Sequence, residues 1–79
     1  MNYYAIYFRH HVLKFECYAS EKEAIDFLIN GECLGDLSTV GVLDGKKKHY
    51  AVISDGYTLG SGYADTVQCF DELKRMGEL

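Results

Sequence analysis

The sequence lacks the cysteine pattern of a disulfide-stabilised domain and lacks a long uninterrupted apolar segment. Its three cysteines, Cys17, Cys33 and Cys69, are an odd number and form no C-x-x-C pair. A disulfide framework is therefore not expected, and the cysteines should be free thiols. The apolar stretch 1–15 is interrupted by Arg9, His10, His11 and Lys14, so it has neither the apolar region of a signal peptide nor the length to cross a membrane. These features predict a cytoplasmic protein.

Basic residues are also scarce, with eight Lys and Arg against twelve Asp and Glu and a net charge of −4. Duplex DNA and acidic membranes are disfavoured as main partners, because binding them requires a cationic surface. The 79 residues predict a single compact domain, 1–79. So short a chain buries a modest core, and a partner or a second copy is a natural source of extra stability. We therefore expect a protein partner or a homodimer.

Aromatic and β-branched residues predict a β-hairpin over residues 3–18, turning at His10-His11. An even-length loop there places an apolar set on one face of the hairpin. That set is Tyr4, Ile6, Phe8, Leu13, Phe15 and Cys17. Ser20 and Glu23 form a capping box ahead of an amphipathic helix, and Asn30-Gly31 is the predicted stop.

A second hairpin is predicted from 38–43 and 47–54, with an odd-length loop that places Gly45 in the left-handed region. The glycine-rich stretch 55–63 is expected to be mainly a loop, with a short strand near 57–59. The closing helix is predicted over Thr66–Met76, capped by Asp65 and ended by Gly77.

This order of elements, ββαββα, predicts an α+β fold of two layers. The expected architecture is a mostly antiparallel four-stranded sheet with two amphipathic helices packed on one face. The other sheet face would then be open or covered by a partner.

The predicted open face has the composition of a binding surface. Tyrosine and arginine are enriched among the few interface residues that supply most of the binding energy between proteins. The predicted binding residues are Tyr3, Tyr7, Arg9, Lys14 and Tyr18. On this hypothesis Tyr7→Ala leaves folding largely intact and weakens association. Exposed tyrosines could instead simply reflect the preference of this residue for strands.

Two other features leave an alternative open. The glycine-rich loop could hold a phosphate-bearing ligand through Tyr57, Gly60, Ser61, Gly62 and Tyr63, although it matches no phosphate-binding fingerprint. Lys46, Lys47 and Lys48 could contact phosphates, and exposed tyrosines can stack bases. The alternative function is therefore a binder of single-stranded nucleic acid or of a small nucleotide.

Residues for catalysis or metal binding do not form a recognisable pattern. His10, His11 and His49 lack the spacing of a zinc site. No serine or cysteine has an identifiable base and orienting acid. We expect no enzymatic activity, no catalytic residue, no metal and no cofactor.

The stretch Tyr7-Phe8-Arg9-His10-His11-Val12-Leu13-Lys14-Phe15-Glu16, followed by Phe27-Leu28-Ile29-Asn30-Gly31-Glu32, resembles small bacteriophage- or prophage-encoded proteins of unassigned function. The resemblance covers about the first two-thirds of the chain. It implies an accessory protein that binds a host or viral macromolecule as an adaptor or inhibitor. We therefore predict a non-enzymatic protein-interaction module.

Overall fold

The first hairpin organises the sheet in the computed structural model, which describes residues 1–79. Strands β1 (Tyr3–Arg9) and β2 (Val12–Tyr18) pair in the predicted register, with Ile6 opposite Phe15. The turn residues His10 and His11 have φ values of 52° and 65°. Positive φ at both central residues defines the tight hairpin turn that matches strand twist. The predicted even loop is confirmed without the usual Asn-Gly.

Strand β1 lies in the interior of a four-stranded antiparallel sheet of order β2-β1-β3-β4. The other strands are β3 (Ser38–Asp44) and β4 (His49–Tyr50). The β1–β3 register shifts beside Ile6 and Tyr7, where Val40 has no partner and forms a bulge. Because of this bulge, Val40 packs in a different core cluster from Val42.

The predicted second hairpin is divided in two. Asp44 and Lys48 flank a three-residue loop, since the Asp44 N–H donates to the Lys48 carbonyl at 3.1 Å. The odd loop is confirmed, but the left-handed residue is Lys47 (φ 62°) and not Gly45. The strand predicted to continue through 54 breaks after β4. Its remainder, β5 (Val52–Ser54), pairs with β6 (Tyr57–Leu59) in a separate two-stranded sheet.

Helix α1 (Glu21–Cys33) begins where predicted, because the Ser20 hydroxyl accepts a hydrogen bond from the Glu23 N–H at 3.2 Å. Its predicted stop at Gly31 is wrong. Gly31 is buried inside the helix, where a Cβ would lie 2.4 Å from the Leu37 side chain, so the glycine allows close packing. The chain turns left-handed at Gly35 instead, with φ 69°.

Helix α2 (Tyr63–Arg75) begins earlier than predicted, with Gly62 as its N-cap and no capping side chain. Asp65 lies in the first turn of the helix, where its charge is favourable to the helix dipole, and is not the cap. Gly77 follows the helix with φ 79°, which confirms the predicted end.

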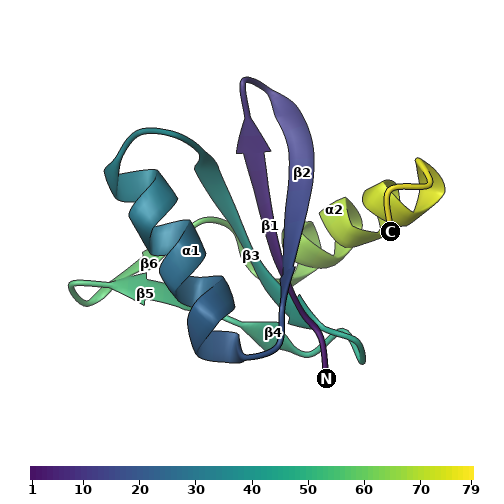
Figure 1. Ribbon diagram of the computed structural model, residues 1–79, viewed down its shortest axis with the longest axis horizontal. Helices are drawn as coiled ribbons and strands as arrows, with labels where there is room; N and C mark the ends of the chain where they lie inside the picture. Colours follow the sequence, from purple (N-terminus) through teal and green to yellow (C-terminus); the bar gives the residue numbers. More distant parts are fainter.

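The two helices lie on opposite faces of the main sheet (Figure 1). Beneath α1, Ala24 and Leu28 pack with Ala5, Tyr7 and other core residues. A second core, formed with α2, has five fully or nearly buried members: Ile6, Val40, Leu43, Phe70 and Leu73. The α+β class is confirmed, whereas the two-layer arrangement with both helices on one face is wrong. Each face of β1 is apolar, so each face can be covered.

Candidate interaction surface

The predicted tyrosine surface is covered by α1. Tyr7 is only 3% exposed, and its ring meets that of Phe27 edge-on with centroids 5.3 Å apart. Tyr18 also contacts Phe27, while Tyr3 packs edge-on against Tyr50. Burial, together with the nearby negative charge of Glu16, raises the pKa of Tyr7 and of Tyr18. The expectation that these three tyrosines face outward is wrong, because an amphipathic helix occupies that side of the hairpin.

Arg9 and Lys14 lie nearer the tip of the hairpin. The Arg9 guanidinium lies 5.3 Å from the centre of the Tyr7 ring and forms an ion pair with Asp36 at 2.9 Å. It therefore joins β1 to the connection between α1 and β3. Lys14 is exposed on β2, opposite Tyr7 on β1, and makes no ion pair. Of the five predicted binding residues, Lys14 alone is exposed.

The residues of the predicted ligand loop are used to join the small sheet to the rest of the fold. Gly60 has φ 80°, and a Cβ there would lie 2.6 Å from the Val40 carbonyl oxygen. The Ser61 N–H donates to that same oxygen at 2.8 Å, and Gly62 caps α2. Tyr57 and Tyr63 are 75% and 54% exposed, and neither lines any of the three hollows in the surface. Gly60 and Gly62 therefore have structural roles, the first in a close approach to β3 and the second at the start of α2.

The lysine-rich loop is organised by Asp44. Its carboxylate accepts hydrogen bonds from the N–H groups of Lys46 and Lys48, at 2.8 and 3.0 Å, and from the Tyr50 hydroxyl at 3.1 Å. Burial opposes ionisation of Asp44, but these hydrogen-bond donors outweigh it and lower the pKa of the carboxyl. Burial and the hydrogen bond to Asp44 raise the pKa of Tyr50 to about 12. Lys47 forms an ion pair with Asp71 of α2 at 2.9 Å. The loop is therefore partly neutralised within the chain.

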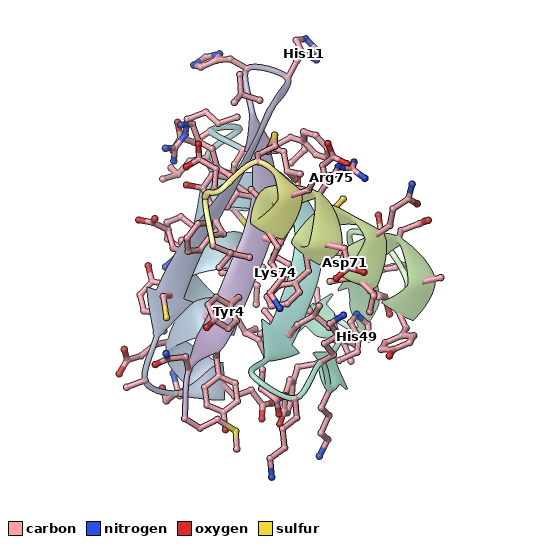
Figure 2. All side chains as sticks on the ribbon, turned by 90° about the vertical axis from the view of Figure 1, so that its right-hand side faces the viewer. Tyr4, His11, His49, Asp71, Lys74 and Arg75 are labelled. Atoms are coloured by element: carbon pink, nitrogen blue, oxygen red, sulfur yellow. The ribbon has the colours of Figure 1, made fainter.

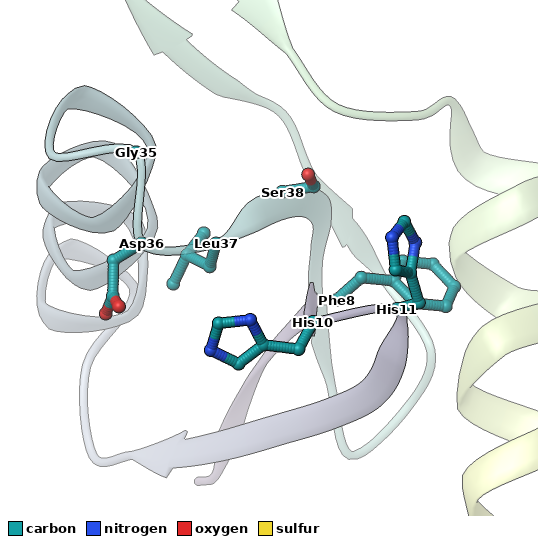
Figure 3. A pocket seen from close by; sticks show the side chains of 7 residues that line it. All are labelled: Phe8, His10, His11, Gly35, Asp36, Leu37 and Ser38. Atoms are coloured by element: carbon teal, nitrogen blue, oxygen red, sulfur yellow. The ribbon is translucent and has the colours of Figure 1, made fainter.

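The histidines and cysteines are dispersed. His10 and His11 point to opposite sides of the hairpin turn (Figure 3). The Nε2 atom of His49 is buried without a hydrogen-bond partner, and its ring lies 6.1 Å from that of Tyr63. Burial, with a smaller effect of Asp65, raises the pKa of the Cys69 thiol, whereas Cys17 and Cys33 are exposed. No three metal-binding side chains of these types come together.

The hairpin formed by β1 and β2 stands clear of the helices at its tip, which His11 marks in Figure 2. A hollow of about 500 Å³ separates the tip from the connection between α1 and β3; His10, Asp36 and Leu37 help to line it (Figure 3). Another, of about 470 Å³, lies between the tip and α2, lined in part by Leu13 and Met76. The tip is therefore accessible from both faces of the sheet.

Strand β2 provides the longest free edge of the sheet. It has seven residues and pairs on one side only, with β1, whereas the opposite edge strand, β4, has two residues. A hollow of about 350 Å³ runs beside the middle of β2 and is lined by Lys14, Phe15 and Glu16, among others. An edge strand presents unpaired N–H and C=O groups that can pair with another chain.

The backbone groups that face this free edge follow from one hydrogen bond. Since the Asp44 N–H donates to Lys48, the Asp44 backbone faces β4. The direction of the backbone N–H and C=O groups alternates along a strand, so those of Leu43 face β1 and those of its partner Tyr4 face β3. The backbone groups of Tyr3 then face β2. The same alternation along β2 leaves three residues with backbone N–H and C=O groups directed away from the sheet: Leu13, Phe15 and Cys17.

Comparisons with protein-family models, curated protein sequences and solved structures gave no match. Neither helix of this chain has the length and apolar composition needed to cross a bilayer. The side chains and strand edges described above are therefore the basis for inferring what the protein does.

Proposed function

We propose that this protein is a non-enzymatic interaction module that binds an extended polypeptide segment by adding it as a strand to the edge of β2. The single observation that carries the proposal is the seven-residue edge strand with outward backbone groups at Leu13, Phe15 and Cys17. In strand addition, main-chain hydrogen bonds supply affinity and alternate side chains supply specificity. This mode requires no pocket and no open sheet face.

The side chains of β2 are suited to such a contact. Leu13 and Phe15 are half-buried on the α2 side of the sheet, where they leave part of their apolar surface uncovered. Lys14 and Glu16 project on the opposite side and are exposed. A bound segment would thus meet apolar side chains on one face and one charge of each sign on the other.

The stretch 7–16 that resembles phage proteins includes the turn and most of β2. A strand edge that recognises the backbone groups of a partner would suit a host-directed adaptor or inhibitor acting in the cytoplasm. The nucleic-acid alternative has less support, because α1 covers Tyr7 and Tyr18, and Lys47 is paired with Asp71. Base stacking and phosphate binding would both need these groups free.

Selection of binders from a library of displayed extended peptides tests the proposal. Selected peptides should protect the backbone amides of Leu13, Phe15 and Cys17 from hydrogen exchange. Cys17→Pro removes an outward N–H without removing a hydrogen bond to β1, so it should abolish binding and leave the fold intact. Cys17→Ala, which keeps the N–H, is the matched control. Peptides that bind Cys17→Pro as well as wild type would overturn the proposal.

A further inference from the structure

We propose that the segment added to β2 is the β2 strand of a second copy of this chain, paired antiparallel about a twofold axis at Phe15. The inference rests on the proposed function and identifies its partner. The two four-stranded sheets would then join into one continuous sheet across the dimer. A symmetric pair of this kind requires that the same edge be complementary to itself.

The backbone restricts how two β2 strands can meet. Outward groups of one copy must face outward groups of the other, so Leu13, Phe15 and Cys17 have to pair among themselves. A twofold axis at Phe15 places Phe15 opposite Phe15 and Leu13 opposite Cys17. All seven residues of β2 then have a partner, and on the order of six backbone hydrogen bonds form. Axes at Leu13 or Cys17 leave much of the strand unpaired.

The charges select among the remaining registers. An axis at Lys14 would place lysine directly opposite lysine, and an axis at Glu16 would place glutamate opposite glutamate. The axis at Phe15 places Lys14 of each copy opposite Glu16 of the other, so two attractive pairs form. Directly opposed like charges destabilise a sheet, and opposite charges stabilise it. The edge is therefore self-complementary in the register that also pairs the most backbone.

The other cross-strand neighbours agree with this register. Val12, which is 53% exposed, would lie opposite Tyr18, and a β-branched residue facing an aromatic ring is a favourable pair. The two Phe15 rings would meet on the α2 side, where each is half-buried in the monomer. The charged pairs lie on the other side, so apolar and ionic contacts do not compete.

Charge reversal with sedimentation equilibrium tests the dimer from about 10 µM to about 1 mM, the range in which small interfaces associate. Wild type should dimerise. Lys14→Glu and Glu16→Lys, each alone, should weaken dimerisation about tenfold or more, because both opposed pairs become repulsive. An equimolar mixture of the two variants should form a heterodimer, and the double variant Lys14→Glu/Glu16→Lys should dimerise as wild type does. Lys46→Glu, an equal change of charge away from β2, should have no effect.

Several outcomes would overturn the inference: a monomeric wild type throughout this range, a dimer unaffected by either single reversal, or no association in the mixture. The last two would assign Lys14 only the role of discouraging edge aggregation. Circular dichroism and urea unfolding of each variant confirm that folding is retained. A monomeric chain that still binds peptides in a manner sensitive to Cys17→Pro would overturn self-pairing and leave the proposed function standing. A monomeric chain that also binds no peptide in a manner sensitive to Cys17→Pro would overturn both the self-pairing and the proposed function.

Discussion

Replacing Tyr7 with alanine should remove a large fraction of the stability of the protein, because α1 covers this side chain. Tyr7 is 3% exposed and belongs to the core that joins α1 to the sheet. Its ring contacts Phe27 edge-on, with 5.3 Å between centroids and 64° between planes. The Arg9 guanidinium lies over the ring at 5.3 Å. The substitution therefore removes a helix contact, a cation–aromatic contact and core volume together.

The expected loss can be set against the total stability. Truncating a buried aromatic residue to alanine costs about 3–5 kcal/mol. A domain of 79 residues has a free energy of unfolding of about 4–12 kcal/mol. Tyr7→Ala therefore removes a large fraction of the stability and, at the lower end of this range, all of it. The edge-on contact with Phe27 accounts for about 0.5–1.5 kcal/mol of the loss.

Urea unfolding followed by circular dichroism measures this loss. Tyr7→Leu, a milder change, and Phe27→Leu allow a double-mutant cycle that isolates the ring–ring contact. Tyr57→Ala is a matched control, because Tyr57 is 75% exposed and its removal should change stability by about 0.5 kcal/mol or less. An unfolding midpoint for Tyr7→Ala equal to that of wild type would refute the placement of α1 over the hairpin.

Three further outcomes follow from the turns and loops. Because the pKa of Asp44 is lowered in the folded protein, the stability that its carboxylate contributes is fully present above the unfolded pKa of about 4 and is lost as the pH falls through the folded pKa. Asp44→Asn should therefore weaken the loss of stability at acid pH, as measured by urea unfolding at a series of pH values. Burial and the Asp44 hydrogen bond raise the pKa of Tyr50 to about 12, so stability should fall between about pH 10 and that value, and Tyr50→Phe should abolish this part of the alkaline loss. Gly60→Ala should cost about 2–4 kcal/mol by thermal unfolding, because it combines a positive φ with a backbone carbonyl oxygen 2.6 Å from the new Cβ. Gly56→Ala, with the same φ and open space around it, should cost less; equal costs would show that the close approach at Gly60 has no energetic weight.

Local features of the fold could be predicted because neighbouring residues determine them. The register of the first hairpin follows from the parity of its loop, and Ser20 caps α1 through a hydrogen bond to a residue three positions away. The odd loop after Asp44 follows from the same parity reasoning. The continuation of α1 through Gly31 could not be predicted, because the reason for this glycine is its close contact with Leu37 from outside the helix.

The sequence contains a signal for the position of α1 over the hairpin, which the prediction of an open face leaves out. The run Tyr3-Tyr4-Ala5-Ile6-Tyr7-Phe8 has no polar residue on either face, and an unbroken apolar strand is typical of one covered on both sides. The prediction of an open tyrosine face rests on an alternating strand with one solvent-exposed side. In the structure Tyr7 and Tyr18 instead pack against Phe27 of α1, within the same chain.

The sequence by itself determined which residues pair within the first hairpin, where α1 starts and which residues of β1 and β2 share a face, since these depend on alternation and on groups a few positions apart. Only the tertiary structure decided that β3 pairs with β1 and not with β2, and that the helices take opposite faces. Either strand of a hairpin can accept a third strand, and the choice depends on how distant apolar surfaces are buried together. That choice leaves the backbone of Leu13, Phe15 and Cys17 open to a partner.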